Sequence, residues 1–170
     1  MTPEEFRAAY PKLRGWIQKT LLAHETEAQP VAALGFARLP LYFGESFLAT
    51  AKFVPANRLP MPPLAEMGLG RFAAFMPSDA AAVTYLDTYF IKPGVLGSEP
   101  VHFHELIHVL QWRALGPEGF LAAYSNGLES FGYRDSPLET MAYNAEALFT
   151  QASAVFNAEE FVAKQLAKVR

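Results

Sequence analysis

The pattern of apolar and polar positions divides the chain into a helical start, a middle with strands and a helical second half. Thr2 to Glu5 has the form of a capping box, with Pro3 at the first helical position. After Pro11 the pattern predicts that a helix restarts, with these residues at helical spacing: Leu13, Trp16, Ile17, Thr20, Leu21 and His24. We expect this helix to turn its apolar face toward the core, with His24 as a packing residue.

The middle of the chain carries strand patterns of unequal strength. Residues 46–54 and 70–76 are possible strands, and a proline-rich loop at 55–63 lies between them. Residues 82–92 form the clearest strand, because β-branched, aromatic and apolar side chains dominate the segment until Pro93-Gly94 ends it.

The second half of the chain is predicted to be helical. The pattern indicates four helices, over residues 98–116, 117–125 and 137–155 and from 157 onward. Asn126-Gly127 interrupts the second of them, and Asn157 with Glu160 gives the last one a capping box. Since a helix comes first, strands follow and helices end the chain, we predict an α+β fold.

Composition limits the chemistry that the chain can perform. With 170 residues, 51% of them hydrophobic, the chain is predicted to form one domain over 1–170 with a substantial core. It contains no cysteine, so disulfides and thiolate metal sites are excluded. Any metal site must therefore be built from histidine, aspartate and glutamate.

Charge and hydropathy argue against nucleic acid and membrane as partners. The net charge is −3 and no cluster of lysine and arginine occurs, so nucleic acid is not an expected partner. The sequence has no apolar run of about 18 residues, the minimum for a membrane-spanning helix. Thr2-Pro3-Glu4-Glu5 is unlike a signal peptide. We expect a cytoplasmic protein.

One segment, His104-Glu105-Leu106-Ile107-His108, carries a specific chemical prediction. Residues four apart share a face of a helix, so both imidazoles can reach one metal ion. Glu105 follows the first histidine and can act as a general base on a water at that metal. The same spacing is typical of zinc hydrolases. Because the flanking residues are apolar, these polar groups need partners, and a metal ion supplies one.

The third ligand has to come from outside the motif, because a hydrolytic zinc site has three protein ligands and an open position. His102 lies about 200° around the helix from His104, so it faces away. Glu139 and Glu146 are seven residues apart on the next predicted helix, share one face, and are both candidates. Ser136-x-x-Glu139 also fits a capping box, in which Glu139 would bind backbone amides instead.

The motif, followed by Ser136-Pro137-Leu138-Glu139-Thr140-Met141-Ala142, resembles the gluzincin group of zinc metallopeptidases, especially its small single-domain minigluzincin members. The resemblance covers about residues 82–147. It implies that Glu139 is the third ligand and that Ala142 lets two helices approach closely. The strand at 82–92 is similar to the edge strand on which these enzymes bind extended substrate. The implied fold is zincin-like: a small mixed or antiparallel sheet, an active-site helix and a helical C-terminal half.

The expected cofactor is Zn²⁺, because two imidazoles and a carboxylate at an open site suit this ion. His104, His108 and Glu139 would bind it, and Glu105 would be the general base. Zinc lowers the pKa of a bound water to about 7 and polarises a carbonyl group. These roles predict a peptidase.

The oxyanion of such a reaction needs a donor besides the metal. Tyr143, one turn beyond Glu139, is the expected donor, and the alternatives are Tyr124, Tyr133 and His102. The expected substrate is a peptide or protein. The alternative function is a non-catalytic metal-binding module that binds a peptide or partner, but Glu105 beside the histidines favours catalysis. The sequence does not indicate an oligomeric state.

Overall fold

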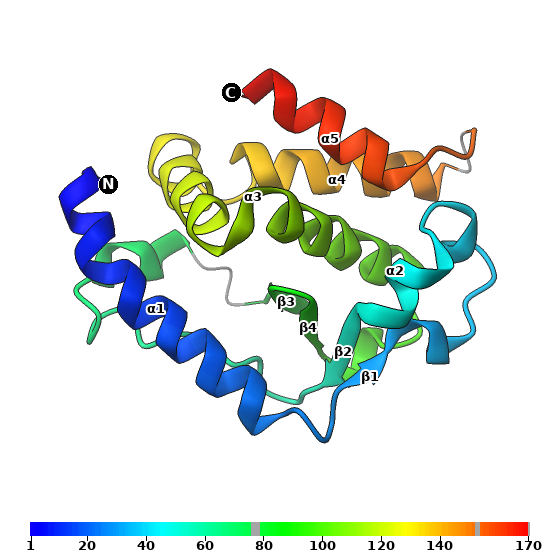
Figure 1. Ribbon diagram of the computed structural model, residues 1–170, viewed down its shortest axis with the longest axis horizontal. Coiled ribbons are helices and arrows are strands. Elements are labelled where there is room, and N and C mark those ends of the chain that lie inside the picture. The colour runs from blue at the N-terminus through cyan, green and yellow to red at the C-terminus, as the bar shows by residue number, and fades with distance from the viewer. Residues whose placement is uncertain (76–78, 152–153, 170) are drawn as a thin grey trace.

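A computed structural model describes residues 1–75, 79–151 and 154–169, and its elements alternate between helices and short strands before three helices end the chain (Figure 1). The α-helices are α1 (Pro3–Ala23), α2 (Glu45–Thr50), α3 (Glu99–Phe131), α4 (Pro137–Thr150) and α5 (Ala158–Val169). The strands are β1 (Gln29–Pro30), β2 (Lys52–Pro55), β3 (Ala82–Tyr85) and β4 (Thr88–Ile91). Short 3₁₀ helices are η1 (Val31–Leu34), η2 (Leu39–Leu41), η3 (Gly70–Phe75) and η4 (Pro93–Val95). The predicted α+β class, the mixed sheet and the helical C-terminal half are confirmed.

The four strands form one mixed sheet in the order β1-β2-β4-β3. β2 runs parallel to β4, whereas β1–β2 and β3–β4 are antiparallel pairs. β3 therefore lies at an edge of the sheet. Side chains alternate between the two faces of a strand. Thr84 of β3 contacts α3, whereas Tyr85 packs edge-on against Trp16 of α1.

The long helix α3 lies between the sheet and the C-terminal helices, with α4 and α5 on its other side (Figure 1). This central position explains why the helix is apolar on nearly every face: Phe103, Leu106, Ile107 and Val109 are all fully buried. The described part of the chain contains no helix that is both long enough and apolar enough to cross a membrane.

All three predicted strands differ from the structure. Residues 46–50 belong to α2, and only the end of the 46–54 segment enters β2. Residues 70–75 form η3 instead of a strand, and Met76 lies outside the described residues. The segment 82–92 is a hairpin of β3 and β4, not one strand. Leu86 makes the turn with a left-handed φ of +59°, a conformation that side chains of its type seldom adopt.

The helical predictions need smaller corrections. α1 starts at the capping box as predicted but continues through Pro11 without a break. The break predicted at Gly116 is present as a kink, with φ +68° and ψ 168°, inside the continuous element α3. The predicted interruption at Asn126-Gly127 is wrong, since α3 runs on to Phe131. α4 ends at Thr150 and not at 155. Asn157 does cap the last helix, through a bond to the Glu160 amide.

The apolar core has two parts. The main part joins the sheet, α2 and the first half of α3 with α4 and α5. A smaller cluster joins α1 and η3 to the far half of α3, and its buried members are Ala9, Leu13, Leu69, Phe72 and Leu128. The motif at 104–108 lies in the first half of α3, close to the cleft between these two clusters.

Candidate metal centre

α3 presents His104, Glu105 and His108 in the interior of the molecule. Each of these side chains is less than 9% exposed, although all three are polar or charged. Charged side chains are rarely buried to this extent unless they have a partner. The motif is therefore an internal polar cluster and not a solvated face.

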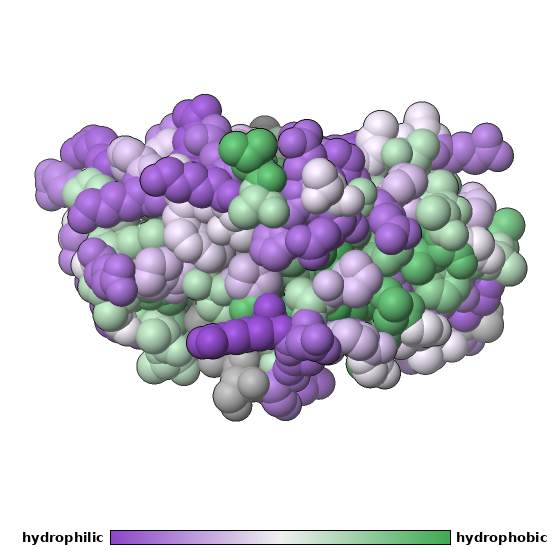
Figure 2. Space-filling view, turned by 90° about the horizontal axis from the view of Figure 1, so that it is seen from below, coloured by the Kyte–Doolittle hydropathy of each residue, from purple (hydrophilic) through white to green (hydrophobic). Residues whose placement is uncertain are grey.

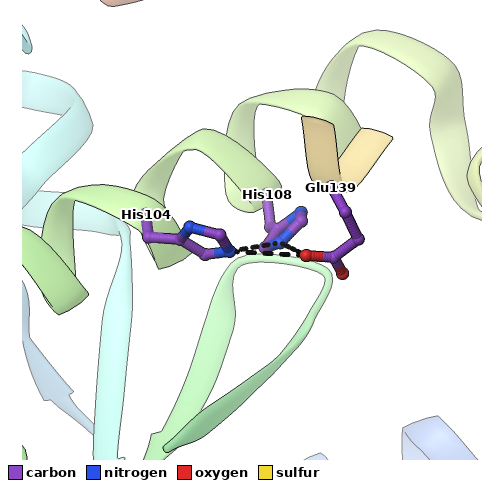
Figure 3. A group of neighbouring side chains, drawn as sticks. All are labelled: His104, His108 and Glu139. Carbon is purple, nitrogen blue, oxygen red and sulfur yellow. Dashed lines mark hydrogen bonds and ion pairs between the residues drawn. The ribbon is translucent and has the colours of Figure 1, made fainter. Parts of the chain in front are cut away.

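Glu139 comes from the first turn of α4 and points at the two histidines (Figure 3). It is 2% exposed. The predicted alternative, a capping box with Ser136, is wrong: Ser136 makes no capping hydrogen bond, and its hydroxyl has no partner among the described residues. The start of α4 lies close to α3 at Gly127, where a Cβ atom would be 3.0 Å from Pro137 Cδ. This close approach, together with the fully buried Ala142, brings Glu139 to the histidines.

The three candidate ligand atoms form a nearly equilateral triangle. His104 Nε2 lies 3.1 Å from His108 Nε2, and Glu139 Oε2 lies 3.5 Å from each of them. A tetrahedral zinc ion with bonds of about 2.0–2.1 Å holds its ligand atoms about 3.3 Å apart. The triangle therefore has the size that zinc requires. Glu139 Oε2 is also buried without a hydrogen-bond partner in the described part of the chain, which a cation would resolve.

The other nitrogen of each histidine is already bonded. His104 Nδ1 lies 3.0 Å from Glu146 Oε2, and His108 Nδ1 lies 2.8 Å from Gln111 Oε1. A carboxylate accepts hydrogen bonds only, so His104 donates through Nδ1.

The orientation of the Gln111 amide is also fixed. Its Nε2 donates to the carbonyl oxygen of Leu138 at 2.9 Å, so its Oε1 must face His108 and accept. Both imidazoles consequently carry a proton on Nδ1. When both rings are neutral, their Nε2 lone pairs therefore face the triangle, as metal ligation requires.

Tyr124 fixes the second oxygen of Glu139. Its hydroxyl donates to Glu139 Oε1 at 2.8 Å. Burial, and after it the charge of Glu139, raises the pKa of Tyr124 well above its usual range, so the hydroxyl stays protonated. Oε2 is thereby left as the free oxygen that faces the histidines.

The electrostatics of the site favour positive charge. Burial lowers the pKa of His104, but its interactions with Glu139 and Glu146 outweigh burial and raise that pKa to about 10. Burial also lowers the pKa of His108, and Glu139 more than reverses this shift. Burial raises the pKa of Glu139, but the neighbouring imidazolium charges hold it well below its usual range. In the metal-free protein, protons on the imidazoles supply the positive charge that a bound cation would otherwise supply.

Glu105 is directed toward the edge strand. Thr84 of β3 donates to Glu105 Oε2 at 2.5 Å. Among the described residues, nothing bonds the other carboxylate oxygen. Glu105 shares the lining of a cavity with His108 and Glu139. The predicted general base therefore has one anchored oxygen and one free oxygen beside the metal ligands.

Of the candidate oxyanion donors, two lie beside the site, one is already bonded to Glu139 and one faces away. The ring of Tyr143 lies 4.6 Å from that of His104, and burial raises its pKa, so its hydroxyl stays protonated. Tyr133 lines the cavity beside the site. Tyr124 is engaged by Glu139. His102 faces away as predicted and is fully buried between Tyr89 and the carbonyl of Leu96.

Three supporting side chains were missed or misread in the sequence. Glu146, considered as a ligand, bonds the outer nitrogen of His104 instead of entering the triangle. Gln111 was not singled out, although it stands three residues after His108 and therefore on the same helix face. The sequence does not indicate a role for Thr84, because its contact with Glu105 joins distant parts of the chain.

Comparison with known proteins finds no relative: no family model, no curated protein and no solved structure matches this chain. The function must therefore be inferred from the geometry of the site.

Proposed function

We propose that this protein is a zinc-dependent hydrolase that cleaves peptide bonds. The observation that carries the proposal is the triangle of His104 Nε2, His108 Nε2 and Glu139 Oε2, with edges of 3.1, 3.5 and 3.5 Å. The resemblance of the sequence motif to gluzincins supports the same conclusion. The second supporting observation is Glu105, since a purely structural metal site has no use for a buried carboxylate beside the ligands.

The chain's own residues prepare the site for zinc in two ways. Glu146 and Gln111 hold the histidines with their lone pairs toward the triangle, and Tyr124 holds Glu139. A bound zinc ion would supply a Lewis acid and a water of pKa about 7. With three protein ligands, the fourth position stays open for that water.

Glu105 would take the proton from the water through its free oxygen and pass it to the leaving amine. Thr84 keeps the carboxylate in place by its hydrogen bond to the other oxygen. Tyr143, whose ring lies 4.6 Å from that of His104 and whose hydroxyl stays protonated, is the proposed donor to the developing oxyanion.

A peptide is the proposed substrate because β3 is an edge strand next to Glu105. An extended peptide can add to such an edge through main-chain hydrogen bonds. The absence of cysteine suits a reducing compartment, so we place the activity in the cytoplasm.

Metal analysis tests the proposal first. The untagged protein should hold about one zinc ion per chain by elemental mass spectrometry, and both Glu139→Ala and the milder Glu139→Gln should hold clearly less. A protein that holds no zinc after zinc is supplied would overturn the proposal.

A peptidase screen then separates the enzyme from a non-catalytic metal-binding module. The wild type should cleave peptides, and Glu105→Gln should bind zinc equally well but cleave about 10²–10⁴-fold more slowly. Equal activity in Glu105→Gln would assign catalysis to another residue. Stoichiometric zinc with no cleavage of a broad peptide library would favour the module.

A further inference from the structure

A partly open cavity of about 140 Å³ adjoins the metal triangle, and the proposed chemistry does not explain it. Glu105, His108 and Glu139 form one end of its lining. The remainder extends away from α4, between the two apolar clusters. Anything bound there lies next to the reacting groups.

One wall of the cavity is a stack of aromatic rings on α3. Trp112 and Phe120 are stacked with ring centroids 3.9 Å apart, and Phe120 stacks on Tyr124 at 5.6 Å. The rings are within 14° of parallel. Phe6 and Leu13 of α1 and Phe72 of η3 also line the cavity. A flat apolar group is the shape that such walls accommodate best.

Several polar side chains of the cavity wall are already engaged. Thr84 donates to Glu105, Tyr124 to Glu139, and Ser125 to the carbonyl of Ala122. Trp112 differs: its indole N–H is buried and has no acceptor among the described residues. A buried donor without an acceptor costs about 1–3 kcal/mol. Because this N–H is enclosed by protein atoms, Trp112 lines the cavity with its apolar ring.

The cavity adjoins a wider surface depression of about 600 Å³ that the proline-rich segment borders. Met61, Pro62, Leu64 and Ala80 line both spaces, so a ligand can approach from this side. On the face of the molecule seen in Figure 2, hydrophilic residues prevail along the top and left of the view, and hydrophobic residues gather toward the right.

We propose that this cavity is a specificity pocket that binds one aromatic side chain of the substrate. The assignment of the bound group as part of a substrate rests on the proposed peptidase function. The size of the pocket sets the class: a cavity of ~150 Å³ lined by apolar side chains accommodates a benzene ring. A long acyl chain exceeds this volume.

Side-chain analogues test the pocket without any metal or catalysis. Toluene represents phenylalanine and p-cresol represents tyrosine, and ligand-observed NMR titration of the zinc-free protein gives a Kd for each. The wild type should bind both.

Ser125→Leu and Asn126→Leu are a matched pair for the cavity itself. Ser125 lines the cavity, whereas the neighbouring Asn126 is exposed and does not. Ser125→Leu should weaken both probes at least about tenfold by filling the space, and Asn126→Leu should leave both Kd values unchanged. If the wild type binds neither probe, or if Ser125→Leu binds them normally, the pocket assignment is wrong.

Peptide cleavage then tests the link to the substrate. Zinc-loaded wild type should prefer peptides with tyrosine or phenylalanine beside the scissile bond over the same peptides with glycine, and Ser125→Leu should lose this preference. Cleavage without the preference would overturn the substrate class and leave the peptidase intact. Probe binding in a protein that takes up no zinc would overturn the peptidase and leave only the pocket.

Discussion

Gln111 is the side chain that sets the tautomer of His108, so its removal should weaken metal binding. It bonds His108 Nδ1 through Oε1 and the Leu138 carbonyl through Nε2, and it is fully buried. Gln111→Leu should lower zinc affinity about 10–100-fold, the usual effect of losing an outer hydrogen bond to a metal-binding histidine. Competition with a chelator of known affinity measures this.

Gln111→Glu is the control for that experiment. The carboxylate can still accept from His108 but can no longer donate to Leu138, so the loss of zinc affinity should be smaller than in Gln111→Leu. Thermal unfolding of both metal-free variants shows whether they are folded. Wild-type zinc affinity in a folded Gln111→Leu would mean that the metal alone orients His108.

For individual residues, the sequence predicts which side chains come together when their spacing along one helix decides it. His104 and His108 share a helix face because they are four residues apart, and the structure brings them together with Glu139 as expected. The side chains that hold these three residues depend on how helices pack. Tyr124 reaches Glu139 only because α3 bends before it and α4 starts nearby. The spacing of residues along one helix does not predict how two helices pack against each other.

The kink of α3 depends on Gly116, and a side chain there should destabilise the protein. Its φ of +68° and ψ of 168° lie in a region that is nearly restricted to glycine. Gly116→Ala should lower the free energy of unfolding by about 1–3 kcal/mol, as measured by urea denaturation. It should also weaken zinc binding, because the bend places Tyr124 against Glu139.

Gly119, on the same helix beyond the kink, provides the opposite control. An added Cβ would meet only the Leu115 Cβ at 3.5 Å, which is ordinary contact. Gly119→Ala should therefore raise the free energy of unfolding by about 0.5–1 kcal/mol, because alanine favours a helix. Equal effects of the two substitutions would show that Gly116 does not require its backbone conformation.

Elements were predictable where the local pattern agreed with the packing. The long helices after Gly97 have caps, prolines and apolar faces that all favour the same structure. The hairpin of β3 and β4 was missed because Leu86-Asp87 lacks the glycine or asparagine typical of a tight turn. The segment 46–50 has the apolar residues of a strand, but it forms α2, whose Phe47 and Leu48 are buried in the main core. Tertiary packing decides such short apolar segments.

The three elements of the smaller apolar cluster are linked at the surface by Arg71 of η3, which should make a small, pH-dependent contribution to stability. Its guanidinium bonds both carboxylate oxygens of Glu5 in α1, at 3.0 and 2.9 Å, and Glu129 of α3 at 3.2 Å. The hydrogen bonds from Arg71 lower the pKa of Glu5 from 4.5 to about 2. Because these groups are half-exposed, salt should weaken the effect.

The sign of that dependence follows from the lowered pKa. The stabilisation is fully present above pH 4.5, where Glu5 is ionised in both folded and unfolded chains, and is lost as the pH falls toward 2. The difference in unfolding free energy between wild type and Arg71→Ala should therefore be largest near neutral pH and shrink below pH 4.5. A difference that stays constant down to pH 2 would contradict the pairing with Glu5.

The metal site should give the whole molecule a second pH dependence, of opposite sign, that zinc removes. In the metal-free protein the carboxylates around His104 raise its pKa from 6.5 to about 10. This stabilisation is complete below pH 6.5 and is lost as the pH rises through 10, since the folded chain must then give up the proton that balances Glu139.

Zinc takes the place of that proton, and both imidazoles bind it in their neutral form. Between pH 6.5 and 9 the unfolding free energy of the metal-free protein should therefore decline, whereas that of the zinc-saturated protein should decline less. Comparing the two forms of one chain cancels the titration of lysines and tyrosines far from the site. Parallel curves would mean that the triangle of His104, His108 and Glu139 exchanges no protons for the metal, and that zinc binds elsewhere.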